Sequence, residues 1–216
     1  MAKAKVYCDV ELKRMKSIRF TTVFLVLLLV YVDYSSCCTS NDLTKLAEYQ
    51  FVFKDRAIKN VFLLENAIKD DLNAFTLSFF VKLEQGAGEY QCVFSYATPE
   101  STYGNGIYVC MTRTIQIDIA NNDRVTNVKI DDNLMHHISV TWENCEGNWQ
   151  LFVDGKLAER GTGFMKDHVI PHGGTAVIGN DQDKMGGGFE MRDAFGPGES
   201  YRNPSHDLRT VSIEYE

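Results

Sequence analysis

Four carboxylates and one amide lie within thirteen residues, in the segment IGNDQDKMGGGFEMRD at 178–193. They are Asp181, Gln182, Asp183, Glu190 and Asp193. The glycines at 186–188 allow the chain to fold back, so that the last two carboxylates approach the first two. Calcium takes about six to eight oxygen ligands, and carboxylates that gather without a cation repel one another. The cluster is therefore compatible with a calcium site without EF-hand spacing, but taken alone it slightly favours a solvated acidic loop.

The sequence lacks the motifs of common enzyme classes. It contains no G-x-S-x-G, H-E-x-x-H or P-loop pattern. Glycoside hydrolysis needs two carboxylates about 5–9.5 Å apart, whereas Asp118 is a lone carboxylate in a strand pattern. His137 falls on the polar side of another strand, where a structural hydrogen bond is the commoner role. We therefore predict that the protein is not an enzyme.

The charge is unevenly distributed along the chain. Of the 22 basic and 29 acidic residues, six basic and three acidic ones lie in residues 1–38. Residues 39–216 therefore carry a formal charge of −10, against −7 for the whole chain. Nucleic-acid binding needs a basic surface, so we expect no nucleic-acid partner. The acidic surplus favours solubility and also supplies oxygen ligands for a hard cation.

An uncharged run of thirteen residues at 20–32, FTTVFLVLLLVYV, follows a basic cluster. A membrane span needs about 20 apolar residues, so the run is typical of the helical core of a signal peptide. We predict a signal peptide at 1–38 with an extended n-region, an alternative start at Met15 and cleavage near 36–40. The protein is then secreted, and a signal anchor at the cell surface is the alternative.

Export to an oxidising compartment permits disulfides. Cys92 and Cys110 lie on neighbouring strand patterns, nearly symmetric about the loop between them, so a hairpin would place them within disulfide range. Cys145 falls in a surface turn, where pairing with Cys37 or Cys38, a free thiol and a link between chains all remain open. No Cys-x-x-Cys occurs, which argues against a structural zinc site.

Short segments rich in β-branched and aromatic residues alternate with turn signals from residue 51 onward. They are 51–53, 61–64, 74–85, 90–97, 106–120, 125–130, 137–144, 149–155 and 175–179. Many short strands without intervening helices are typical of an all-β sandwich, of which the jelly roll is one form. Ile138, Val140 and Trp142 share one face of their strand, which we expect to lie in the core.

Six stretches of the sequence resemble the pentraxin domain, in the same order. They are AFTLSFFVK at 74–82, VFSYAT at 93–98, HISVTW at 137–142, WQLFVDGK at 149–156, HGGTAVIGNDQD at 172–183 and GGGFE at 186–190. The resemblance implies a concanavalin-like jelly-roll sandwich of two antiparallel sheets, often a cyclic pentamer with calcium on one face. It divides the chain into a pentraxin-like domain at 39–195 and a divergent tail at 196–216, in which the family's closing strands find no match.

The resemblance also implies a set of calcium ligands. They are Asp181, Gln182 through its backbone carbonyl, Asp183, Glu190, Asp193 and Asn105. Gly104 stands where the family has an aspartate, so one ligand charge is missing and a weaker affinity is implied unless Glu100 reaches the site. Ser78 and Ser139 occupy the positions of the family's disulfide. Cys110 replaces the aromatic residue of the choline pocket, so phosphocholine recognition is not implied.

The sequence thus predicts a secreted, calcium-dependent recognition module of the pentraxin type. Its expected ligands are anionic small molecules, glycans or phospholipid head groups, and its expected assembly is a homo-oligomer, a pentamer by resemblance. The alternative is an extracellular interaction or assembly domain with a degenerate metal site.

Overall fold

The structure is a computed structural model that describes residues 3–7, 10–14, 49–53, 56–83, 90–99, 105–111, 113–196 and 209–215. Fourteen strands lie in these ranges: β1 (Lys3–Tyr7), β2 (Val10–Arg14), β3 (Tyr49–Phe53), β4 (Val61–Glu65), β5 (Ala74–Lys82), β6 (Gln91–Ala97), β7 (Asn105–Met111), β8 (Ile115–Ile119), β9 (Asn122–Val125), β10 (Met135–Glu143), β11 (Trp149–Val153), β12 (Lys156–Gly161), β13 (Thr175–Ile178) and β14 (Arg209–Tyr215). None of the described ranges contains a helix long and apolar enough to cross a membrane.

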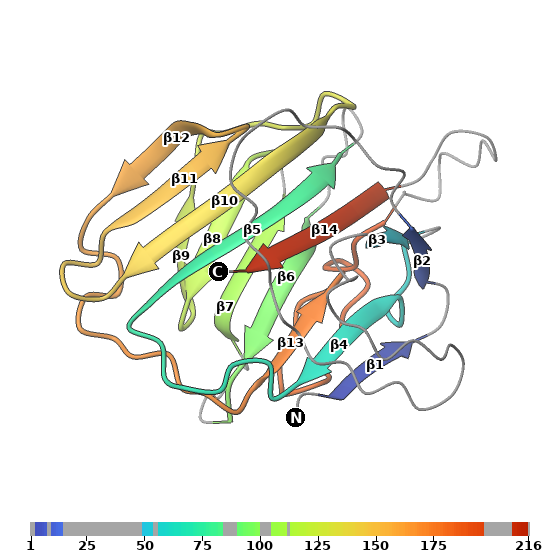
Figure 1. Ribbon diagram of the computed structural model, residues 1–216, viewed down its shortest axis with the longest axis horizontal. Helices are drawn as coiled ribbons and strands as arrows, with labels where there is room; N and C mark the ends of the chain where they lie inside the picture. The colour runs from blue at the N-terminus through green and yellow to red at the C-terminus, as the bar shows by residue number, and fades with distance from the viewer. Residues whose placement is uncertain are drawn as a thin grey trace.

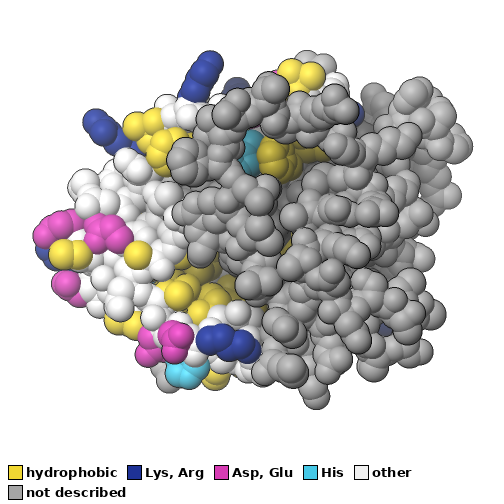
Figure 2. All heavy atoms as spheres, in the orientation of Figure 1, with side chains coloured by type: hydrophobic (Ala, Val, Ile, Leu, Met, Phe, Trp, Pro, Cys, Tyr) yellow, Lys and Arg dark blue, Asp and Glu magenta, His cyan; other side chains and the backbone are white. Residues whose placement is uncertain are grey.

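The strands form two seven-stranded antiparallel sheets that pack face to face (Figure 1). The first sheet has the order β1-β4-β13-β6-β7-β8-β9, and the second has the order β12-β11-β10-β5-β14-β3-β2. The second sheet is the front layer in Figure 1, and Figure 2 shows acidic, basic and hydrophobic side chains interspersed on the visible part of its outer face. The predicted all-β sandwich of two antiparallel sheets is confirmed.

The alternation of residues along the strands places the core between the sheets. In β10, Ile138, Val140 and Trp142 are buried as predicted. The neighbouring strand β5, which pairs with β10 in the same sheet, directs its own row of buried residues towards the core. The Trp142 indole donates a hydrogen bond from Nε1 to the Phe164 carbonyl at 2.7 Å. The buried ring therefore keeps its polar atom satisfied, as a core tryptophan requires.

The strands of the structure differ from the predicted ones in three places. The single run at 106–120 is two strands, β7 and β8, which pair with each other. The predicted strand at 125–130 is wrong, because pairing ends at Val125 and the next residues bond irregularly to Ile115. Strand β12 was not predicted, since KLAERG has no apolar alternation and pairs only with β11.

Both ends of the sequence contribute strands. In the segment predicted to be a signal peptide, β1 pairs with β4 and β2 pairs with β3. The apolar run at 20–32 and the expected cleavage region lie outside the described residues. In the tail where the family's closing strands find no match, β14 lies between β5 and β3 (Figure 1).

A histidine between two aspartates fixes the start of β10. The His136 ring lies 2.8 Å from Asp154 Oδ2 through Nδ1 and 3.0 Å from Asp132 Oδ1 through Nε2. Burial lowers the pKa of His136, but the hydrogen bonds to the two carboxylates outweigh it and raise the pKa above 6.5. The Leu134 amide and then His136 lower the pKa of Asp132, whereas burial raises the pKa of Asp154 but the His137 amide and His136 outweigh it and lower that pKa.

We expect this cluster to make stability depend on pH. Because the folded-state pKa of His136 is raised, its contribution is complete below about pH 6.5 and disappears as pH rises through the folded-state pKa. The difference in unfolding free energy between the wild type and His136→Gln should therefore shrink from pH 6 towards pH 9, as measured by urea unfolding. A difference that grows with pH would show that the ring is neutral in the folded protein.

Candidate functional site

The acidic segment leaves β13 at Gly179 and is anchored by Gln182, whose side chain is fully buried. The Gln182 Oε1 atom accepts hydrogen bonds from Thr175 Oγ1 at 2.7 Å and from the Gly186 amide at 2.9 Å. Its Nε2 donates to the carbonyls of Thr175 and Ser95 at 3.0 and 3.2 Å. The side-chain amide is thus occupied by protein partners, and the backbone carbonyl is the group that Gln182 would have left for a metal.

The glycines fold the segment back as predicted. Lys184 and Gly187 exchange backbone hydrogen bonds of 2.9 and 3.3 Å, so a tight turn lies between them. Gly188 has a φ of +76°, and a Cβ built on it would lie 2.7 Å from the Cβ of Asp183. The returning chain therefore runs directly against the first half of the acidic segment.

Asp193 lies within electrostatic reach of two other predicted carboxylates, those of Glu190 and Asp183. Burial raises the pKa of Asp193, Arg192 lowers it, and Glu190 and Asp183 raise it further. The Arg192 Nε lies 2.6 Å from Glu190 Oε2 and 3.6 Å from Asp193 Oδ2. An arginine thus neutralises part of the negative charge that the turn gathers.

Asp181 faces another group of residues. One of its oxygens accepts a hydrogen bond from the Gln182 amide at 2.8 Å. Burial is the main cause that raises the pKa of Tyr90, Tyr108 and Asp118, and the charge of Asp181 adds to it. Among the side chains that the structure describes, no group of three His, Cys, Asp or Glu residues is close enough to hold a metal ion. Asn105 begins β7, but its side chain, Gly104 and Glu100 lie outside the described parts.

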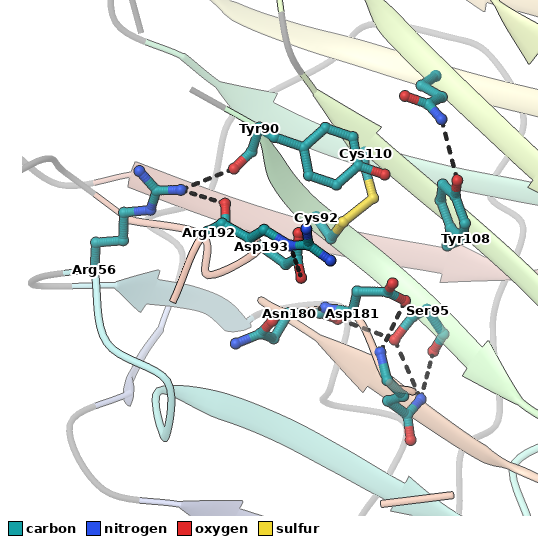
Figure 3. Close-up of a disulfide and its surroundings, with 12 residues drawn as sticks. Arg56, Tyr90, Cys92, Ser95, Tyr108, Cys110, Asn180, Asp181, Arg192 and Asp193 are labelled. Atoms are coloured by element: carbon teal, nitrogen blue, oxygen red, sulfur yellow. Dashed lines mark hydrogen bonds and ion pairs between the residues drawn. A yellow bond between two sulfur atoms is a disulfide. The ribbon is translucent and has the colours of Figure 1, made fainter. Parts of the chain in front are cut away.

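The predicted disulfide between Cys92 and Cys110 is present (Figure 3). The two residues face each other in the β6–β7 register, both are fully buried, and they form a cluster with Tyr90 and Tyr108 that is separate from the core between the sheets. Cys145 is exposed and has no disulfide partner among the described cysteines, while Cys37 and Cys38 lie outside the described ranges.

A buried carboxylate and two tyrosines beside the disulfide were not predicted as a group. Burial raises the pKa of Asp118 to about 7 and that of Tyr90 to about 12. The Asn121 amide donates to Asp118 at 2.9 Å, and Gln116 donates to the Tyr108 hydroxyl at 3.1 Å. Asp118 is therefore a structural acceptor within the sheet, and the single carboxylate in its strand pattern gave no signal of these partners.

Arg56 is a second residue that sequence reasoning missed. Its guanidinium donates to the backbone carbonyls of Tyr90 and Arg192 (Figure 3) and to that of Ala194, so it contacts the end of the acidic segment and the residue directly after it. No motif marks Arg56 in the run KDRAIKN, because its partners are distant in sequence.

The donor set fits a hard cation. All the expected ligands offer oxygen, which suits calcium rather than zinc or copper. In the structure Glu190 is paired with Arg192 and Asp181 with a backbone amide, so these carboxylates have protein partners.

Comparison with known proteins decides the family. The model of the pentaxin family matches residues 49–199, which is more than half of the chain. This chain is a member of the pentraxin family. Pentraxins are in general calcium-binding recognition proteins without enzymatic activity, and the homologues are extracellular or secreted.

Two relatives and one solved structure illustrate the similarity. The pentraxin domain is 32% identical to neuronal pentraxin-2 of Homo sapiens over 127 residues, which is 58% of this chain and 29% of that protein. It is 29% identical over 140 residues to the sushi, von Willebrand factor type A, EGF and pentraxin domain-containing protein 1 of Rattus norvegicus, covering 62% of this chain and 4% of that protein. The chain therefore spans less than a third of either relative.

The solved structure is the native heptameric SAP-like pentraxin from Limulus polyphemus. Its TM-score is 0.52 at 21% sequence identity, and the match covers 68% of this chain and 66% of that chain. At this level of identity the similarity establishes the fold alone.

We expect Gly188→Ala to disturb the acidic segment of this pentraxin. The new methyl group would displace Asp183, and misplacing a metal ligand or its support typically weakens metal affinity about 10–100-fold. Calcium affinity measured by titration calorimetry should therefore fall at least about 10-fold. Gly163→Ala is the matched control, because its φ is +72° and nothing lies within 4 Å of its added Cβ. Equal affinities for the two variants would contradict the prediction.

Proposed function

We propose that this pentraxin domain is a secreted, calcium-dependent recognition module whose acidic segment binds calcium. The observation that carries the proposal is the glycine turn, which folds Gly188 back against Asp183, with Asp193 within electrostatic reach of both Asp183 and Glu190. The buried side chain of Gln182 fixes the backbone at the start of the segment. The proposed ligands are Asp181, the Gln182 carbonyl, Asp183, Glu190, Asp193 and Asn105.

Bound calcium supplies positive charge on an otherwise acidic surface. A metal ion is often the largest local charge in a site and reverses the local electrostatics. The carboxylates hold the cation, and anionic small molecules, acidic glycans or phospholipid head groups are the proposed recognition partners. We propose a non-enzymatic role.

We also propose that the domain assembles into a homo-oligomer. The family resemblance favours a cyclic pentamer, whereas the Limulus polyphemus neighbour is described as heptameric. Sedimentation of the secreted protein with and without calcium distinguishes these assemblies from a monomer.

Thermal unfolding of the full chain in calcium and in EDTA tests the calcium site. A ligand that binds only the folded state at about 100 times its Kd adds about 2.7 kcal/mol to the unfolding free energy. We expect a higher Tm in calcium, no such shift for Asp183→Asn, and a normal shift for Asp70→Asn, an exposed acidic residue in the loop after β4. A cooperative transition with the same Tm in calcium and in EDTA would overturn the proposal. Phosphatidylserine vesicles and a sulfated glycan then serve as ligand probes.

The arrangement of Arg192 favours one alternative function. Its guanidinium already pairs with Glu190 and lies near Asp193, so the acidic segment is partly neutralised without a metal. In that case the domain is an extracellular interaction or assembly module with a degenerate metal site. Calcium-independent unfolding together with calcium-independent oligomers would support this second function.

A further inference from the structure

We propose that Arg56 is the positioning residue of the acidic segment, because its guanidinium fixes the backbone on both sides of Asp193. The inference rests on the proposed calcium site and adds to it a residue that offers the metal no ligand. It identifies what determines the affinity of the site beyond the carboxylates themselves.

The guanidinium reaches two separate parts of the chain. Its Nε donates to the Ala194 carbonyl at 2.9 Å, and its Nη2 donates to the Tyr90 carbonyl at 2.8 Å and to the Arg192 carbonyl. The half-buried Arg56 side chain therefore ties the end of the acidic segment to the start of β6 (Figure 3). Hydrogen bonds from a charged donor are stronger than those between neutral groups, so the Arg56 guanidinium holds these carbonyls more strongly than a neutral donor would.

Three consecutive carbonyls are held by protein donors, two at the end of the acidic segment and one directly after it. Arg56 binds those of residues 192 and 194, and the Cys92 amide binds that of Asp193 at 2.8 Å. Residues 188–196 form no strand, so no sheet ladder fixes their path. The Phe195 amide, which donates to the Gly179 carbonyl at 2.8 Å, completes the attachment. The backbone of Asp193 is thus fixed from both sides, while its carboxylate lies 3.6 Å from the Arg192 Nε.

The planar fork of an arginine suits this task. Arginine offers five N–H donors in a fixed geometry, whereas lysine offers three donors on a single nitrogen. A lysine at position 56 retains the positive charge but cannot span carbonyls on two segments with the same geometry. The pair Arg56→Ala and Arg56→Lys therefore separates positioning from charge.

Calorimetric titration of the full chain with calcium is the first test. We expect Arg56→Ala to weaken calcium binding at least about 10-fold, the effect typical of groups that orient metal ligands, and Arg56→Lys to recover only part of the loss. Arg124→Ala is the matched control, since Arg124 also donates to a carbonyl, that of Asp123 at 2.8 Å, and stacks over Phe164 away from the segment. Wild-type affinity in Arg56→Ala would overturn the inference.

Hydrogen exchange without calcium separates this inference from the proposed function. In Arg56→Ala and Arg56→Lys, the amides of Cys92 and Phe195 should exchange faster than in the wild type, because Asp193, the acceptor for Cys92, and Phe195 itself lie among or next to the residues that Arg56 holds. The Ile170 amide, bonded to Leu72 at 3.0 Å, serves as the internal control. Unchanged protection would overturn the role of Arg56 even if calcium binds. Absence of calcium binding by the wild type would overturn the proposed function, and the exchange result would still decide whether Arg56 holds the segment.

Discussion

The double substitution Ser78→Cys and Ser139→Cys is expected to form a disulfide that stabilises the protein by about 4 kcal/mol. The two serines are direct partners in the β5–β10 register, and their Oγ atoms are 2.8 Å apart. Directly opposed residues of antiparallel strands have Cβ atoms about 4.5–5.5 Å apart, close to the spacing that a disulfide needs. Their sequence separation of 61 makes the closed loop long, which increases the loss of unfolded-state entropy.

Urea unfolding of the oxidised double variant measures this gain. The wild type must be compared under the same redox conditions, because reduction would also act on the bond between Cys92 and Cys110. Each single variant controls for the loss of the Ser78–Ser139 hydrogen bond. If peptide mapping finds free thiols at both positions after oxidation, the pairing of Ser78 with Ser139 across β5 and β10 does not hold in solution.

Gly179→Ala is expected to destabilise the protein by about 4 kcal/mol. The residue has a φ of +101°, where a side chain costs about 1–3 kcal/mol. A Cβ there would lie 2.3 Å from the Phe53 ring and 2.9 Å from the Asn60 carbonyl. Phe53 is fully buried and packs edge-to-face on Phe195, so the ring has little room to move, and overpacking adds about 1–3 kcal/mol.

The control for this prediction is Gly155→Ala in the turn between β11 and β12. Gly155 has a φ of +73° with nothing within 4 Å of an added Cβ, so only backbone strain is expected. The difference in urea-unfolding free energy between the two variants isolates the clash at Gly179. Equal losses would mean that Phe53 and the start of the acidic segment can rearrange at low cost.

The strands with one buried face were the ones that sequence predicted well. In β10 the alternation of Ile138, Val140 and Trp142 follows directly from burial against the opposite sheet. Strand β9, whose four residues are all exposed, and the mostly exposed β12 lie at sheet edges, where pairing with a neighbour rather than burial creates the strand. Residues without apolar periodicity give no signal of this kind.

In the candidate site, too, some features could be predicted from the sequence and others could not. The Cys92–Cys110 bond and the glycine turn depend on contacts close in sequence, so spacing predicted them. Arg56 was missed because its acceptors lie 34 to 138 residues away. Gln182 was predicted only through its backbone, since the burial of its amide depends on how β6 and β13 pair.

The place of β14 has a consequence for the order of events during synthesis. This strand comes after every other described strand in the sequence, yet it lies between β5 and β3 and is the hydrogen-bonded link that joins β3 and β2 to the rest of their sheet. A nascent chain can form the first sheet and the strands from β5 to β12 before β14 leaves the ribosome, but the second sheet stays divided, with two open edges. A chaperone or a neighbouring nascent chain would meet those edges during that interval.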